Sequence, residues 1–315
     1  MLTLIFDSNY LLHRCMKVPD LAELQTSTGM YTGGVFGYLR SIRDVMGRFY
    51  PDVVYAVFDG GISVRRRKDY PPYKGPKYRD RDDPYYEKPD DDDLNQYLER
   101  FTKQRRQLSE ILPCLGIRVV RFKAEADDVI CALSHIIDTT VSIVSDDKDM
   151  LQLVRDGVVV YRPSRQQIVT CDNFKARFGM DRDSYQFCKA VLGDKSDCIA
   201  KVEGVGEETV NVLIKELGDR FGVIYPFTAV FEYCRIHGNR RINKIYEQRD
   251  IVLRNYKLIC FDFEPMEDIY GGLSQITNQP VFVDKHRVSE YFKILELNRL
   301  LGDFNEWVVP FQKLS

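Results

Sequence analysis

Short apolar runs rich in β-branched residues alternate along the first half of the chain with longer segments of helical periodicity. The apolar runs span residues 2–6, 53–58 and 140–145. Runs of this length and composition predict strands that are buried on both faces of a sheet. Between them, apolar positions from Leu94 to Leu112 and from Val129 to Ile137 recur every three to four residues. Strands that alternate with helices predict a mostly parallel α/β sheet flanked by helices.

The pattern changes near residue 172, after which helical periodicity dominates. Further helices are predicted over residues 184–192, 207–217 and 288–301. We therefore expect an α/β domain over 1–172 and a helical C-terminal domain over 173–315. Residues 62–93 interrupt the α/β pattern with prolines and blocks of opposite charge, which predicts a loop or arch.

Composition narrows the classes of chemistry. The net charge is −2 and the sequence pI is about 6.2, so bulk charge favours neither nucleic acid nor membrane. The eight cysteines form no C-x-x-C pair, and neither a P-loop nor an H-E-x-x-H motif is present. No apolar run approaches the roughly 20 residues of a spanning helix. The basic segment of a signal peptide is also missing before Leu2, so a cytoplasmic protein without a membrane partner is expected.

Acidic residues follow each predicted strand. The runs stop at Asp7, Asp59 and Asp146, and the carboxyl ends of parallel strands meet at one edge of a sheet. Taken alone, such an aspartate is as readily a helix N-cap or turn residue. The whole set is harder to explain in that way, because many ionised carboxylates in one crevice need cations to balance them. Oxygen ligands alone favour two Mg²⁺ ions, with Mn²⁺ as a substitute, and phosphoryl chemistry.

Six motifs in this order resemble the 5′-nuclease superfamily, which includes the exonuclease domain of DNA polymerase I and flap endonucleases. They are FDSN at 6–9, VFDG at 57–60, YPPYKGPK at 70–77, EADD at 125–128, SDDKDMLQLV at 145–154 and GDKSDCIAKVEGVG at 193–206. The likeness covers nearly the whole chain and is strongest to the compact phage RNase H enzymes, which carry no polymerase. It implies a PIN-like 5′-nuclease fold with a helix-hairpin-helix motif in the C-terminal region.

The resemblance also implies two metal sites. The first is expected at Asp7, Asp59, Glu125 and Asp127, with Asp128 alongside. The second is expected near Asp147, Asp149, Asp194 and Asp197. This register takes Asp147 and Asp149 as the D-x-D pair and leaves Asp146 outside it.

Basic residues concentrate between residues 65 and 81, where eight lysines and arginines face two acids and alternate with tyrosines. Cations can hold phosphates while aromatic rings stack on unpaired bases, although a solvated loop is the plainer alternative. By resemblance this segment is the arch over the metal edge. It implies that Lys74 contacts the scissile phosphate together with either Lys77 or Arg79, and that Tyr73 stacks on a base. Arg65, Arg66 and Arg67 are expected as further nucleic-acid contacts.

Two glycines, Gly204 and Gly206, precede the helix predicted at 207–217. Alone, such a pair is more often an ordinary turn. By resemblance it belongs to the helical hairpin that holds duplex DNA by its backbone, with K⁺ as an additional cation in some members. Lys195, Lys201 and Lys215 flank it as further nucleic-acid contacts.

These observations predict a divalent-metal-dependent 5′-to-3′ exonuclease or flap endonuclease with RNase H-type activity, a monomer that removes RNA primers during bacteriophage DNA replication. Its substrates would be branched, nicked or flapped duplex DNA and RNA-DNA hybrid. A PIN-like endoribonuclease and a non-catalytic nuclease-like DNA-binding module are the alternatives. The aromatic tail at 304–315 predicts packing on its own domain or docking to a replication clamp or single-strand-binding protein.

Overall fold

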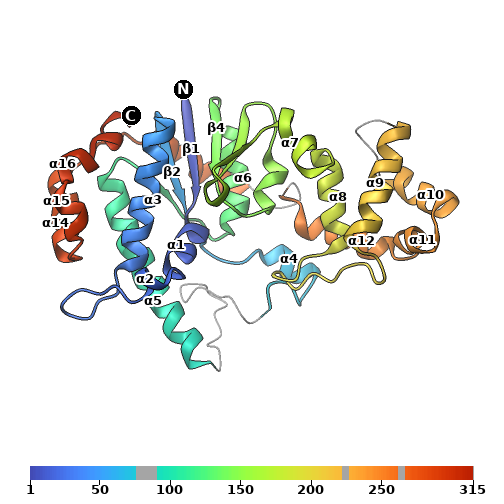
Figure 1. Ribbon diagram of the computed structural model, residues 1–315, viewed down its shortest axis with the longest axis horizontal. Helices are drawn as coiled ribbons and strands as arrows, with labels where there is room; N and C mark the ends of the chain where they lie inside the picture. Colours follow the sequence, from blue (N-terminus) through green and yellow to red (C-terminus); the bar gives the residue numbers. More distant parts are fainter. Residues whose placement is uncertain (76–90, 222–226, 262–266, 315) are drawn as a thin grey trace.

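The computed structural model describes residues 1–75, 91–221, 227–261 and 267–314, and is built around one six-stranded sheet (Figure 1). The strands are β1 (Leu2–Asp7), β2 (Val53–Val57), β3 (Arg118–Val120), β4 (Thr140–Val144), β5 (Val158–Arg162) and β6 (Gln167–Val169). Their order in the sheet is β3-β2-β1-β4-β5-β6. All neighbours are parallel except β6, which is antiparallel to β5. The mostly parallel α/β sheet predicted from the sequence is therefore confirmed.

Both faces of the sheet are buried, which explains the continuous apolar runs. Leu4 and Phe6 of β1 pack into one core, whereas Ile5 packs into the core on the opposite face. The first face is covered by α1 (Ser8–Met16), α3 (Gly33–Phe49) and α5 (Asp92–Cys114), and α2 (Pro19–Ala22) adjoins them. The second face is covered by α6 (Ala126–Ile136) and α13 (Glu267–Thr277), with the short η1 (Asp149–Leu153) at its edge.

A helical group with its own core stands beside the sheet (Figure 1). It contains α8 (Arg182–Leu192), α9 (Glu207–Phe221), α10 (Phe227–His237), α11 (Arg240–Glu247) and α12 (Arg249–Ile259), and α7 (Cys171–Phe178) connects it to β6. Figure 1 places α4 (Val64–Asp69) below the sheet, on the side that the ends of the parallel strands face. The predicted helical region after residue 172 is therefore present.

The last helices return to the sheet, so the predicted boundary at 172 divides the chain in sequence but not in space. These are α14 (Lys285–Ile294), α15 (Asn298–Gly302), α16 (Phe304–Trp307) and η4 (Val309–Lys313), which lie beside α3 and α5 in Figure 1. Val288, Phe292 and Phe311 share the core that covers the first face. The single helix predicted at 288–301 is wrong, because the chain turns between α14 and α15 with Glu296 at φ 51°.

The aromatic tail is part of this core. Trp307 and Phe311 are buried, and the Trp307 ring meets the Phe292 ring edge-on with centroids 5.0 Å apart. Packing of the tail on its own domain, one of the two sequence-based alternatives, is what the structure has. These rings are not available to a clamp or single-strand-binding protein. Within the described ranges, no helix has the length and apolar character needed to cross a bilayer.

Candidate active site

Six of the predicted carboxylates line one pocket of about 340 Å³ at the carboxyl edge of the sheet. They are Asp7, Asp59, Glu125, Asp127, Asp147 and Asp197. The parallel sheet brings together the acids that follow its strands, because β1 lies between β2 and β4 and the chain changes direction across the sheet at that point. Asp197 reaches the same pocket from the loop after α8. Crevices at such switch points are the usual ligand sites of open α/β sheets. The remaining three predicted acids, Asp128, Asp149 and Asp194, do not line this pocket.

Asp7 ends β1 and caps α1. Its carboxylate accepts hydrogen bonds from the Tyr10 backbone N–H (3.1 Å) and from the Ser145 hydroxyl (2.9 Å). Ser145 directly follows β4, so this contact joins the ends of two neighbouring strands. Asp7 therefore serves both as the N-cap that its sequence position allows and as a wall of the pocket.

Asp59 and Glu125 connect the end of β2 to the start of α6. The Ala126 backbone N–H donates to Asp59 at 2.6 Å, and the Asn9 side-chain amide donates to its other oxygen. Glu125 is the N-cap residue of α6 and accepts a 2.9 Å bond from the Ser63 backbone N–H. These bonds fix both carboxylates at the same edge as Asp7.

Burial and mutual repulsion together raise the pKa values of the aspartates in the pocket. Burial and the charge of Asp147 raise the pKa of Asp7 to about 7. The same two causes, with Asp7 as a third, hold the pKa of Asp127 well above its usual range. Burial also raises the pKa values of Asp59, Asp147 and Asp197. Carboxylates that raise one another's pKa in this way gain most from a bound cation.

Glu125 differs from its neighbours because three side-chain donors meet one of its oxygens, Oε2. Lys74 Nζ lies 2.8 Å from Glu125 Oε2, the Tyr73 hydroxyl donates to the same oxygen at 2.9 Å, and Arg66 Nη1 lies 3.3 Å from it. Although burial opposes ionisation, Lys74 and Arg66 lower the pKa of Glu125 to about 2. The pKa of Glu125 thus moves in the opposite direction to those of the aspartates around it.

Arg66, Tyr73 and Asp128 lie in positions that differ from the expected ones. Arg66 is 1% exposed and holds both oxygens of Asp128 at 2.7 and 2.8 Å. Asp128 is 0% exposed. Tyr73 is also buried, with its hydroxyl on Glu125. In this conformation Asp128 is a structural counter-ion rather than a metal ligand, Arg66 cannot reach a nucleic acid, and Tyr73 cannot stack on a base.

The two acids that directly follow Ser145 differ in their partners. Asp146 pairs with Arg14 (3.1 Å) and accepts hydrogen bonds from Ser164. Asp147 instead lines the pocket with Asp7. Its backbone N–H donates to the Ser145 hydroxyl at 3.0 Å, which turns the chain toward the pocket. The geometry thus agrees with the register that leaves Asp146 outside the D-x-D pair.

Lys189 of α8 is a site residue that the sequence reasoning did not single out. Its ammonium forms an ion pair with Asp149 and lies 3.4 Å from Asp194 Oδ2. The Lys74 backbone N–H donates to the Asp197 carbonyl at 2.9 Å, which ties the next loop to the pocket. One feature of the sequence could have pointed to Lys189 as a site residue: it lies on the predicted helix that leads directly into the GDKSD motif.

The carboxylate oxygens of the pocket are of the type that binds a hard divalent cation, but they are not arranged around an ion position in this conformation. In the described residues, no three histidine, cysteine, aspartate or glutamate side chains are arranged to hold an ion in this conformation. Protein groups already hold several of the oxygens, as Lys74 does for Glu125 and Lys189 for Asp149. A set of oxygen donors, of which the five aspartates of the pocket have raised pKa values, nevertheless fits Mg²⁺ or Mn²⁺. We expect the side chains to rotate when ions bind.

The other predicted contacts fall into three groups. Lys77 and Arg79 lie outside the described residues. Arg65 and Arg67 of α4 are half-buried, and Arg65 donates to the Lys257 carbonyl at 3.0 Å. The residues around the glycine loop are exposed, as nucleic-acid contacts must be: Lys195, Lys201, Gly204, Gly206 and Lys215.

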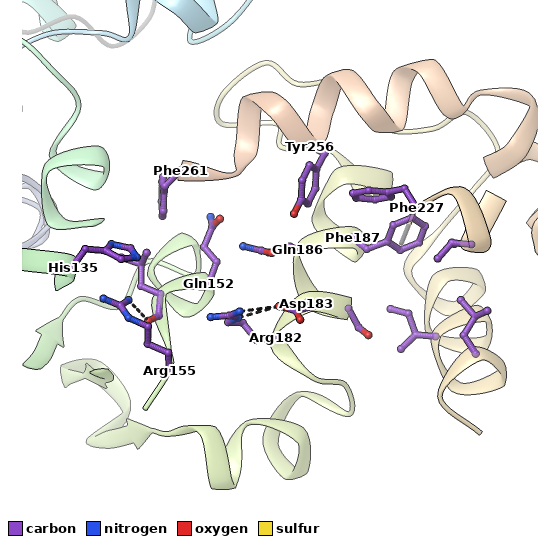
Figure 2. Close-up of a pocket in the computed structure, with 15 residues that line it drawn as sticks. His135, Gln152, Arg155, Arg182, Asp183, Gln186, Phe187, Phe227, Tyr256 and Phe261 are labelled. Atoms are coloured by element: carbon purple, nitrogen blue, oxygen red, sulfur yellow. Dashed lines mark hydrogen bonds and ion pairs between the residues drawn. The ribbon is translucent and has the colours of Figure 1, made fainter. Parts of the chain in front are cut away.

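A second cavity, of about 370 Å³, lies between η1 and the helices α8, α10 and α12 (Figure 2). Its lining includes Arg155, Arg182 and the aromatic residue Tyr256. The one carboxylate in this lining, Asp183, is bonded to Arg182 at 3.0 Å, as Figure 2 shows. Because it lacks a cluster of acids, this cavity is not a second metal pocket.

Comparison with known proteins identifies similar chains. Residues 2–179 match the family model of the 5′-3′ exonuclease, N-terminal resolvase-like domain. The chain is 30% identical over 202 residues to a 5′-3′ exonuclease of Aquifex aeolicus, covering 63% of this chain and 64% of that protein. It is 32% identical over 265 residues to DNA polymerase I of Pseudomonas aeruginosa, covering 82% of this chain but 26% of the polymerase.

A similar fold is found in the flap endonuclease of bacteriophage T5, whose crystal structure contains DNA and metal ions. The TM-score is 0.60 at 19% sequence identity, and the superposition covers 94% of this chain and 98% of the phage protein. Likeness at this level of identity concerns the fold. It extends over the sheet and the helical region alike.

Proposed function

Because the chain belongs to the 5′-3′ exonuclease family, we propose that it is a divalent-metal-dependent 5′-to-3′ exonuclease and flap endonuclease. The observation that carries this proposal is the pocket in which Asp7, Asp59, Glu125, Asp127, Asp147 and Asp197 meet. Its substrates would be 5′ ends on branched, nicked or flapped DNA and on RNA-DNA hybrid. RNA primer removal with RNase H-type activity, cytoplasmic location, phage origin and a monomeric state stay predictions of the same proposal.

The carboxylates would hold two divalent ions, which supply Lewis-acid stabilisation of the phosphoryl group and an activated water. Ion binding would also relieve the repulsion that raises the pKa of Asp7 and Asp127. The chain's own residues set the geometry. Ser145 and Tyr10 hold Asp7 in place, and the N-terminus of α6 holds Asp59.

Among the described residues, Lys74 is the cation that lines the acid pocket and could meet a phosphate there. It lines the acid pocket, and its side chain is 25% exposed although its ammonium lies against Glu125. A phosphate that enters the pocket would compete for this ammonium. Lys74 would therefore bind and orient the scissile phosphate. The ion pair with Glu125 keeps the Lys74 ammonium directed into the pocket.

Replacing Lys74 with Ala should weaken duplex binding and lower the slope of log Kd against log salt by about one unit, because one phosphate contact is lost. Fluorescence anisotropy with a labelled nicked duplex over a range of KCl concentrations measures this slope. The exposed Lys175 on α7 offers a matched control, and Lys175→Ala should leave the slope unchanged. An unaltered slope in Lys74→Ala would mean that Lys74 makes no phosphate contact.

The activity itself is tested by titrating Mg²⁺ against 5′-labelled flap, nicked duplex and RNA-DNA hybrid in parallel and reading product lengths. The proposal expects no cleavage without a divalent ion and short products released from the 5′ end. Cleavage of single-stranded RNA at internal positions would instead favour the PIN-like endoribonuclease. Binding without cleavage at any Mg²⁺ concentration would favour the non-catalytic module.

A further inference from the structure

The glycine loop, residues 203–206, is fastened to the junction between α11 and α12. The Glu203 backbone N–H donates to the Gln248 side-chain oxygen at 2.9 Å, and the Gln248 amide donates back to the Glu203 carbonyl at 3.2 Å. Gly204 has a φ of +73°, which residues with a side chain rarely adopt. The loop is thus held in one conformation by a residue more than 40 positions further along the chain.

Lys244 of α11 lies directly against this loop. A Cβ atom on Gly204 would collide with the Lys244 ammonium and touch the Cδ and Cε atoms of its stem. Glycine at 204 therefore leaves room for the lysine as well as permitting the backbone angle. In the part of the chain that the structure describes, no carboxylate pairs with the Lys244 ammonium. Lys244 thus places a positive charge beside the loop, without an ion pair to any carboxylate among the described residues.

This arrangement does not fit the K⁺ ion expected at the hairpin. Carbonyl oxygens are the ligands that K⁺ prefers in proteins. Here the Val202 carbonyl accepts the Val205 backbone N–H at 3.3 Å, and the Glu203 carbonyl accepts the Gln248 amide. The Lys244 ammonium beside Gly204 would also repel a second monovalent cation at short range.

We propose that the Lys244 ammonium replaces the monovalent cation at the glycine loop and binds a duplex phosphate there, so that this protein holds duplex DNA without K⁺. The inference rests on the proposed function, since it needs a nucleic-acid ligand at the loop. It assigns a role in duplex binding to a residue outside the motifs that identify the family.

The test measures binding of a labelled nicked duplex by anisotropy, with EDTA present to prevent cleavage. Chloride salts of K⁺, Na⁺ and tetramethylammonium are compared at equal ionic strength, because the last ion is too large to enter a carbonyl site. Wild-type Kd should agree within about twofold in all three salts. Lys244→Met, which keeps the stem but removes the charge, should raise Kd about tenfold in tetramethylammonium chloride.

Two further variants separate charge from packing. Lys244→Arg should bind nearly as well as the wild type, because it keeps the positive charge. Lys285→Met removes an exposed lysine at the start of α14, remote from the hairpin in Figure 1, and should leave Kd unchanged. An unchanged Tm of Lys244→Met shows that its weaker binding is not a loss of folding.

Wild-type binding that is several-fold tighter in K⁺ than in the other salts would overturn the inference, as would full affinity in Lys244→Met. Neither result would touch the proposed nuclease function. No duplex binding by the wild type in any salt would instead contradict the proposed function itself.

Discussion

Replacing Asp147 with Asn should reduce turnover by at least about a hundredfold while duplex binding stays within a few-fold of the wild type. Asp147 lines the pocket with Asp7 and Asp127, and its charge contributes to the raised pKa of both. An asparagine there removes one of the proposed anionic ligands while nearly keeping the shape of the side chain. Single-turnover cleavage of a 5′-flap substrate measures the chemical step, and anisotropy in EDTA measures binding.

The same substitution should raise the Tm of the metal-free protein, because one negative charge leaves a crowded pocket. Asp146→Asn is the matched control, since Asp146 pairs with Arg14 and Ser164 outside the pocket. That variant should lower the Tm and keep near-normal turnover. If the two variants exchanged these effects, Asp146 would be the ligand and the register of the D-x-D pair would shift by one residue.

Replacing Arg66 with Met should destabilise the protein by about 3–5 kcal/mol, because breaking one side of a buried ion pair leaves the other charge unpaired. Asp128 is 0% exposed, and both of its oxygens are held by Arg66. Glu125 would lose a donor as well. Urea unfolding of the metal-free protein measures the change in the free energy of unfolding.

A second variant shows that the pair is the cause. Adding Asp128→Leu to Arg66→Met should recover most of the lost stability, since an apolar pair of similar volume needs no counter-ion. If Arg66 instead contacted nucleic acid at the surface, as the sequence suggested, its replacement would not have this effect on stability. In that case Arg66→Met would unfold like the wild type and lose only salt-dependent binding to nucleic acid.

The strands and the convergence of acids could be predicted because both depend on local pattern. Apolar runs such as 2–6 identify strands buried on both faces, and a parallel sheet necessarily brings their carboxyl ends to one edge. Asp7 and Asp59 thus share a pocket as expected. The helix predicted at 207–217 from periodicity likewise begins at Glu207 in the structure.

The partners of individual charges could not be predicted, because they depend on contacts distant in sequence. Arg66 meets Asp128 across 62 positions, and nothing local distinguishes it from its neighbours Arg65 and Arg67. Lys189 was missed for the same reason, as its role appears only when α8 meets η1. Periodicity shows which side of a helix is buried but not against which element it packs, so the return of α14 to the sheet was missed too.

The most direct test of the account is a crystal structure of the protein with Mn²⁺, recorded at a wavelength where manganese scatters anomalously. Two anomalous peaks are expected within the pocket formed by Asp7, Asp59, Glu125, Asp127, Asp147 and Asp197, with Glu125 turned away from Lys74. Peaks found only at other carboxylates, or an empty pocket at Mn²⁺ concentrations that support cleavage, would contradict it.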